Sequence, residues 1–233
     1  MKGVGYSIVL CPRARNSYSI TLKLTQELLH LFAAMGITIV ILLAVAGAQD
    51  TRNIITSILV AQDTSSRAQH AIRASRESKD WLIIINKSNR TLSVYHAGVL
   101  DTVFAAEFGR GRTWGDKERA GDNRTPEGVF KICYRNSQSR FYKALLLDYP
   151  LVEDAERGLR NGLINRSDYR RIQSAIELGE IPDQFTGLGG LIEIHGFGSI
   201  GFDWTRGCIA VKNPEIDYLF ERTRIGTKVI ITE

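Results

Sequence analysis

The sequence Leu191-Ile192-Glu193-Ile194-His195-Gly196, followed by Thr205-Arg206-Gly207-Cys208-Ile209, says most about how this chain folds. The apolar run 191–194 predicts a strand that leads directly into His195. A short Gly-rich segment with an aromatic cluster at 202–204 separates His195 from Cys208. Because a thiol and an imidazole this close in sequence can meet across one loop, the pair predicts a nucleophilic cysteine activated by histidine.

Gly207 stands immediately before the candidate nucleophile. A residue without a Cβ lets the backbone approach a reacting carbonyl closely, so the amides of Gly207 and Cys208 are candidate donors of an oxyanion hole. Arg206 offers a fixed positive charge, either for a substrate carboxylate or to lower the thiol pKa. A surface ion pair is the ordinary alternative for Arg206.

The residues just before Arg206 are further candidates. We expect Trp204 and Thr205 to lie with Arg206 in the substrate-binding part of the site. The Thr205 hydroxyl and the Asp203 carboxylate are also candidates for orienting the catalytic pair.

Each residue of the Cys/His pair also has an ordinary structural interpretation. A lone histidine at a strand end is often structural, and Cys208 could be a small buried core residue. In an oxidising compartment Cys133 and Cys208 could instead form a disulfide. The sequence has no CxxC pair and no HExxH motif, so we expect no structural zinc site.

The flanking sequence predicts a mainly β domain with short helices at its edge. Strands are expected at Trp81–Ile85, Thr91–Tyr95, Val99–Phe108, Gly128–Cys133, Leu191–Ile194 and Lys228–Ile231. The spacing of apolar residues predicts a helix over 163–179, capped by Asn165 or Ser167. A second short helix is expected from Asn213 as N-cap, with Pro214 at the first helical position, to Phe220.

The N-terminal region differs in character from the rest. Leu31–Val45 is almost entirely apolar, follows basic residues and precedes Ala46-Gly47-Ala48, which is the pattern of a secretory signal. An uncleaved membrane anchor is the alternative, and a buried core helix is a further one. We therefore divide the chain into a signal or anchor at 1–48, a partly helical linker at 49–79 and a folded domain at 80–233, exported in either case.

The charge distribution argues against a nucleic-acid partner. The formal net charge is +5, of which the first 48 residues contribute +3. The remainder is only mildly basic and lacks the concentrated Lys/Arg stripe of a nucleic-acid-binding protein.

One further motif precedes the Cys/His pair. Gly121-Asp122-Asn123-Arg124-Thr125-Pro126-Glu127-Gly128 is, taken alone, an ordinary turn. The combination in order of Gly-Asp-x-x-Thr-Pro-Glu-Gly, an Ile-His-Gly strand end and a Gly-Cys-Ile element is more specific. It resembles the L,D-transpeptidase (YkuD-type) catalytic domain of bacterial cell-wall enzymes, from about Trp81 to the C-terminus.

The resemblance implies a mainly β, β-sandwich-like fold and export across the inner membrane, to the periplasm or to an inner-membrane anchor facing it. It implies that Cys208 matches the nucleophile, His195 the general acid/base and Gly207 the glycine beside the nucleophile. Cys208 would form a thioester with a peptidoglycan stem tetrapeptide and pass it to an amine. The amine would come from a second stem or an outer-membrane lipoprotein, and no cofactor or metal is needed. Carbapenems are expected to acylate the cysteine of this family.

The chain also departs from the family pattern. Many members have Ser-His-Gly-Cys where this chain has Thr205-Arg206-Gly207-Cys208, and an arginine where it has Ala210. Two other functions stay open at this point. One is a peptidoglycan hydrolase, an L,D-carboxypeptidase or endopeptidase, that resolves the same thioester with water. The other is a non-catalytic peptidoglycan-binding module.

Overall fold

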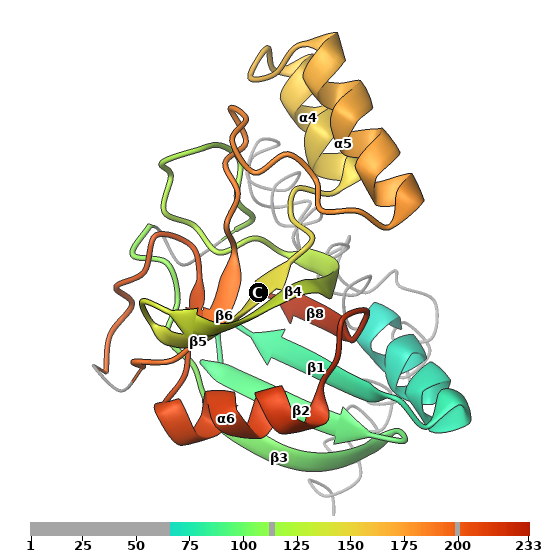
Figure 1. Ribbon diagram of the computed structural model, residues 1–233, viewed down its shortest axis with the longest axis vertical. Coiled ribbons are helices and arrows are strands. Elements are labelled where there is room, and N and C mark those ends of the chain that lie inside the picture. The colour runs from blue at the N-terminus through green and yellow to red at the C-terminus, as the bar shows by residue number, and fades with distance from the viewer. Residues whose placement is uncertain (1–65, 112–114, 199–200) are drawn as a thin grey trace, which may run out of the picture. The chain divides into compact units, whose positions relative to one another are not determined.

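The computed structural model describes residues 66–111, 115–198 and 201–233. In these residues the strands form one mixed sheet in the order β3-β2-β1-β8-β4-β5-β6-β7 (Figure 1). The strands are β1 (Trp81–Asn86), β2 (Thr91–His96), β3 (Val99–Ala105), β4 (Gly128–Ser139), β5 (Tyr142–Leu147), β6 (Glu193–His195), β7 (Ile209–Ala210) and β8 (Lys228–Thr232). The helices with defined bounds are α4 (Val152–Arg160), α5 (Arg166–Leu178) and α6 (Asn213–Arg222).

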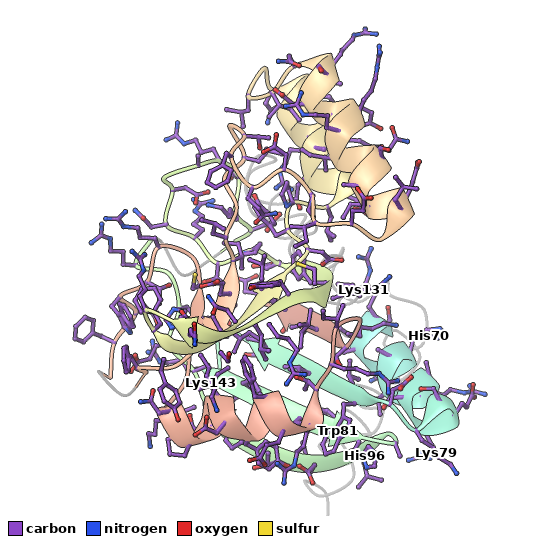
Figure 2. The ribbon with its side chains drawn as sticks, viewed as in Figure 1. His70, Lys79, Trp81, His96, Lys131 and Lys143 are labelled. Carbon is purple, nitrogen blue, oxygen red and sulfur yellow. The ribbon has the colours of Figure 1, made fainter. Side chains whose placement is uncertain are left out.

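The first half of the sheet consists of β3, β2, β1 and β8. Local turns join β1, β2 and β3, whereas β8 comes from the far end of the sequence. β1, β2 and β3 form the predicted antiparallel meander. Trp81 and His96, paired at one end of β1 and β2, stack with ring centroids 4.4 Å apart (Figure 2). β8 then lies parallel to β1 and antiparallel to β4. These central strands are β-branched and apolar, so they are buried where helices and the second half of the sheet cover them.

The long strand β4 joins the two halves of the sheet. It pairs with β8 through 128–131 and with β5 through 132–139. Beyond β3 the chain reaches the other half, where Glu107 bridges Ala210 and Gly109 bridges Thr205. The main core, with Phe108, Phe130 and Tyr149 among its largest buried side chains, is drawn from both halves. The fold is thus mainly β and sandwich-like, as predicted.

The helical residues 66–78 pack on the first half of the sheet. Ala71 is buried against Leu82 of β1 and Ile230 of β8. The segment predicted as a partly helical linker (49–79) therefore contains, over residues 66–78, a helix that belongs to the folded body.

A helical hairpin is inserted between β5 and β6 (Figure 1). The second helix, α5, was predicted, and Asn165 caps it by accepting from the Ser167 and Asp168 amides. The first helix, α4, was not predicted. The hairpin has a small core of its own, formed by Ala155, Ile164, Ile172 and Leu188.

The predicted cap of the last helix is corrected by one residue. The N-cap of α6 is Lys212, and Asn213 is already helical. The Asn213 side chain is engaged elsewhere, because its Oδ1 accepts a hydrogen bond from the Phe197 amide at 2.9 Å. Lys143 of β5 pairs with Asp217 and so ties α6 to the sheet (Figure 2).

The predicted signal or anchor, residues 1–48, lies outside the described residues. Among the helices that the structure does describe, none has the length and apolar character needed to cross a membrane.

Candidate active site

Strand register places His195 and Cys208 on one face of the sheet. β6 and β7 are parallel, with Ile194 opposite Ile209 and His195 opposite Ala210. Side chains alternate between faces along a strand, so Cys208, one residue before β7, points to the same side as Glu193 and His195. Continuing this register by one residue sets Cys208 opposite Glu193, two residues before His195 on the neighbouring strand.

His195 is held in one tautomer. Its side chain is buried, and Nδ1 lies 2.7 Å from the Gly196 carbonyl oxygen. A carbonyl only accepts, so Nδ1 carries the proton and Nε2 keeps its lone pair. Burial lowers the pKa of His195, and the positive charge of Arg140 lowers it further. The imidazole is therefore neutral at pH 7 and able to accept a proton.

Aromatic rings set the plane of the imidazole. Phe141 stacks on His195 with centroids 4.4 Å apart, and Trp204 meets His195 edge-on at 5.7 Å. The Trp204 indole donates to the buried carboxylate of Glu107 at 2.8 Å. Trp204 therefore contacts His195, and Glu107, which the sequence analysis did not single out, holds Trp204 in place.

Cys208 rests as a neutral thiol. Its Sγ donates to the Leu191 carbonyl oxygen at 3.3 Å. Burial raises the pKa of the thiol to about 12, against smaller lowering effects that include the charges of Arg140 and Lys117. The expectation that Arg206 lowers this pKa is not supported, because Arg206 is exposed and is not among these charges.

Thr205 shapes the turn that carries the nucleophile. It is buried, and its hydroxyl donates to the Cys208 carbonyl at 2.7 Å while accepting from the Gly207 amide at 3.1 Å. We predicted a substrate contact for Thr205, whereas the structure uses its hydroxyl inside the protein. The same bond occupies the Gly207 amide, so an oxyanion role for that amide requires it to exchange Thr205 for substrate.

Gly207 is required by the backbone. Its φ is +127°, and a Cβ there would lie 2.7 Å from the carbonyl oxygen of Arg124. The Gly-Asp-x-x-Thr-Pro-Glu-Gly segment therefore packs directly against the nucleophile turn. It is held there by the Gly109 amide, which donates to Thr125 Oγ1 at 3.0 Å, and by a buried ion pair of 2.6 Å between Lys87 and Glu127. The motif is more than the isolated turn that its local sequence suggests.

Asp203 anchors the loop before the nucleophile. Its carboxylate accepts from the Phe108 amide at 2.8 Å and pairs with Arg90 at 3.0 Å. These contacts join the loop to β2 and to the segment after β3. The structure thus gives Asp203 a role in loop position, and the bond that orients His195 comes from Gly196.

The disulfide alternative is excluded. Cys133 and Cys208 are both free thiols. Cys133 lies on β4 and Cys208 beside β7, with β5 and β6 between them. Three strand spacings amount to about 14 Å along the sheet, roughly twice the Cα separation that a disulfide tolerates.

No group of three or more potential metal ligands occurs within residues 66–111, 115–198 and 201–233. The chemistry that the described site offers is that of a thiol, an imidazole and backbone amides.

The same part of the chain is similar to known proteins. Residues 80–231 match the model of the YkuD family, the L,D-transpeptidase catalytic domain. No curated protein matches the chain.

Among solved structures, similar ones include an L,D-transpeptidase from Xylanimonas cellulosilytica, with 17% identity and a TM-score of 0.41, covering 66% of this chain and 61% of that one. Another is the helical cell shape determining protein Pgp2 from Campylobacter jejuni, with 20% identity, a TM-score of 0.43 and coverages of 66% and 48%. A third is an L,D-transpeptidase from Mycobacterium smegmatis, with 15% identity, a TM-score of 0.37 and coverages of 66% and 59%. The chain spans about half to three fifths of the length of these structures.

Proposed function

Since the chain belongs to the YkuD family of L,D-transpeptidase catalytic domains, we propose that it forms a thioester between Cys208 and a peptidoglycan stem tetrapeptide and transfers the acyl group to an amine. The observation that carries this proposal is the arrangement of His195 and Cys208 on one face, with Nδ1 of His195 committed to Gly196. That bond leaves Nε2 as the nitrogen able to take the thiol proton.

The reaction proceeds in two acyl transfers. Nε2 of His195 accepts the Cys208 proton while the sulfur attacks the carbonyl between the third residue of the stem, a diaminopimelate, and its terminal D-alanine. The C–N bond breaks, and the proton on His195 passes to the leaving amine of D-alanine. The acceptor amine then attacks the thioester, a new amide forms, and the thiolate regains a proton.

Activation coincides with substrate binding. The resting thiol donates to Leu191, and both members of the pair are neutral. Sγ must therefore leave the Leu191 carbonyl as the substrate enters. Amides of Gly207 and Cys208 stay our candidates for stabilising the oxyanion, with Gly207 exchanging its Thr205 partner. Arg206, exposed beside the nucleophile, stays a candidate for substrate contact.

The acceptor and the location are part of the same proposal. We infer export to the periplasmic side, by cleavage of residues 1–48 or anchoring through them. The acceptor is an amine of a second stem peptide or of an outer-membrane lipoprotein. Hydrolysis of the same thioester is the second candidate function, supported by a site that needs only a water in place of the amine.

The test uses the full chain incubated with a synthetic stem tetrapeptide, with and without an amine acceptor, and read by mass spectrometry with peptide mapping. We expect an acyl adduct on Cys208 that is absent in Cys208→Ala, strongly slowed in His195→Ala and retained in the matched control Cys133→Ser. An adduct that turns over only with the amine supports transfer, and turnover without it supports hydrolysis.

A carbapenem serves as a second acylating probe in the same assay. A folded protein with a free Cys208 that neither the peptide nor the carbapenem acylates would contradict catalysis and favour the binding module.

A further inference from the structure

Arg140 lies over the aromatic ring that stacks on His195. It lies in the turn between β4 and β5 and is exposed, and its guanidinium carbon is 4.7 Å from the centre of the Phe141 ring. Phe141 in turn stacks on His195 at 4.4 Å. Phe141 therefore contacts both the guanidinium of Arg140 and the imidazole of His195.

The charge of Arg140 acts on the whole site. Burial is the largest influence on the pKa of Glu193, His195 and Cys208, and in all three the charge of Arg140 lowers the pKa. Among the described residues, no carboxylate lies within 4 Å of Arg140 to neutralise it. Lys117, the other cation that acts on Cys208, is already paired with Asp122 at 2.6 Å.

The Arg140 guanidinium lies over the Phe141 ring, a contact that favours one position for it. Its N–H groups have no carboxylate partner among the described residues. A planar, fixed fork of donors suits a carboxylate, which it binds through two parallel hydrogen bonds.

We propose that Arg140 is the carboxylate-binding residue of the site and holds an acidic group of the peptide donor beside Cys208. This inference rests on the proposed function. The donor carries two carboxylates close to the scissile bond, the terminal one on D-alanine and the side-chain one on diaminopimelate. Many members of the family have an arginine where this chain has Ala210. Arg140 would supply a cation from the β4–β5 turn instead.

The alternative role for Arg140 is to offset the charge of Glu193, whose pKa burial raises. In that case the loss of Arg140 would slow acylation by every substrate equally. A carboxylate-binding role predicts a loss that depends on the substrate's own carboxylate, so the two roles give different results.

The experiment measures kcat/KM for acylation of the full-length chain with three tetrapeptide donors. One has diaminopimelate and a free terminal carboxylate, one has the terminal carboxylate replaced by an amide, and one has lysine in place of diaminopimelate. The variants are Arg140→Ala, Arg140→Lys and, as a matched exposed arginine outside the site on α5, Arg170→Ala. Thermal unfolding checks that each variant is folded.

We expect Arg140→Ala to lose about 10- to 100-fold with the first donor, the range for a charged hydrogen bond, and Arg140→Lys to recover part of it. With the donor that lacks the bound carboxylate, wild type and Arg140→Ala should be nearly equal, which identifies which carboxylate is held. Arg170→Ala should show no such dependence on the donor.

Two results would overturn the inference alone: equal rates for wild type and Arg140→Ala with the first donor, or the same loss with all three donors. Failure of the proposed function looks different. In that case the wild type forms no acyl-enzyme with any donor although iodoacetamide still alkylates Cys208, and both proposals fall.

Discussion

At the scale of the residue, the site is made of two neutral partners. The pKa of Cys208 is raised and that of His195 is lowered, in both cases chiefly by burial. Burial disfavours the charged form of either group, so the thiolate–imidazolium pair is not the resting state. In the proposed reaction, proton transfer would therefore accompany attack on the substrate.

This charge state predicts the pH dependence of thiol reactivity. Because only the thiolate reacts and its pKa is raised to about 12, the rate of Cys208 alkylation by iodoacetamide should climb from pH 6 to pH 10 without a plateau. The rate is followed by mass spectrometry of the Cys208 peptide. Cys133, whose pKa burial also raises to about 12, is an internal reference. A plateau below pH 8 at Cys208 alone would show a preformed thiolate instead.

The glycine beside the nucleophile makes a second residue-scale prediction. Gly207→Ala should lower the free energy of unfolding by about 2–3 kcal/mol, because the new Cβ meets the Arg124 carbonyl at 2.7 Å with φ at +127°. Urea denaturation measures the loss, and acylation of Cys208 should disappear.

Gly162→Ala is the matched control for that substitution. Gly162 also has a positive φ, but nothing lies within 4 Å of its added Cβ, so its cost should be about 1 kcal/mol. Equal losses in the two variants would mean that the contact with Arg124 is unimportant.

At the scale of the element, the loop between α5 and β6 sets the position of the thiol. The Gln184 side chain is buried, accepts from the Leu191 amide at 2.7 Å and donates to the carbonyls of Tyr149 and Pro182. Leu191 is held at φ +53°, a conformation that is uncommon for leucine, and its carbonyl receives the Cys208 thiol. Gln184 thus closes the loop into the shape that keeps the thiol protonated.

Gln184→Leu should therefore raise the alkylation rate of Cys208 at pH 7 by about 3- to 10-fold, since one hydrogen bond to the neutral thiol is lost. It should also lower the melting temperature, because two buried carbonyls lose their donor. The iodoacetamide assay and thermal unfolding measure the two effects.

Gln173→Leu, at a half-buried glutamine on α5 whose side chain donates to Glu177 at 3.0 Å, serves as control and should change neither quantity appreciably. If Gln184→Leu were less stable yet reacted at the wild-type rate, Gln184 would be structural only.

At the scale of the whole molecule, the sheet depends on a helix outside the β domain that the sequence outlined. Residues 66–78 cover β1 and β8, and Ala71 is buried against Leu82 and Ile230. This layer keeps water from the face of β1 and β8 on which it packs.

Ala71→Asp in the full chain should lower the free energy of unfolding by about 2–4 kcal/mol, because it places an unpaired carboxylate against apolar strands. Gln69→Asp, the same new charge at an exposed position on this helix, should change it by less than about 0.5 kcal/mol. Chemical denaturation of both variants measures the two changes in the free energy of unfolding. Equal stability of the two would show that the helix is not part of the folded body.

The elements predicted from sequence were those with local signals. β1 is a β-branched run and β2 alternates between apolar and polar residues, and turn-forming residues lie between them. α5 begins at an Asn cap and ends at a Gly. β5 was missed because Ala144–Leu147 is a short apolar run with no period of its own, which pairing with β4 and β6 makes a strand. α4 was missed because its packing partners, such as Leu188, are distant in sequence.

The sequence by itself determined the chemistry available to this protein: a Cys/His pair, a glycine that the nucleophile turn requires and the three ordered motifs of one family. These depend on residue type and short spacing, which a linear pattern preserves. Tertiary structure alone decided that Thr205 faces inward, that Glu107 and Gln184 serve the site and that Arg140 lies over the ring that stacks on His195. The physical reason is that burial, charge and hydrogen-bond partners depend on residues brought together by long-range strand pairing, and these set the pKa of each group.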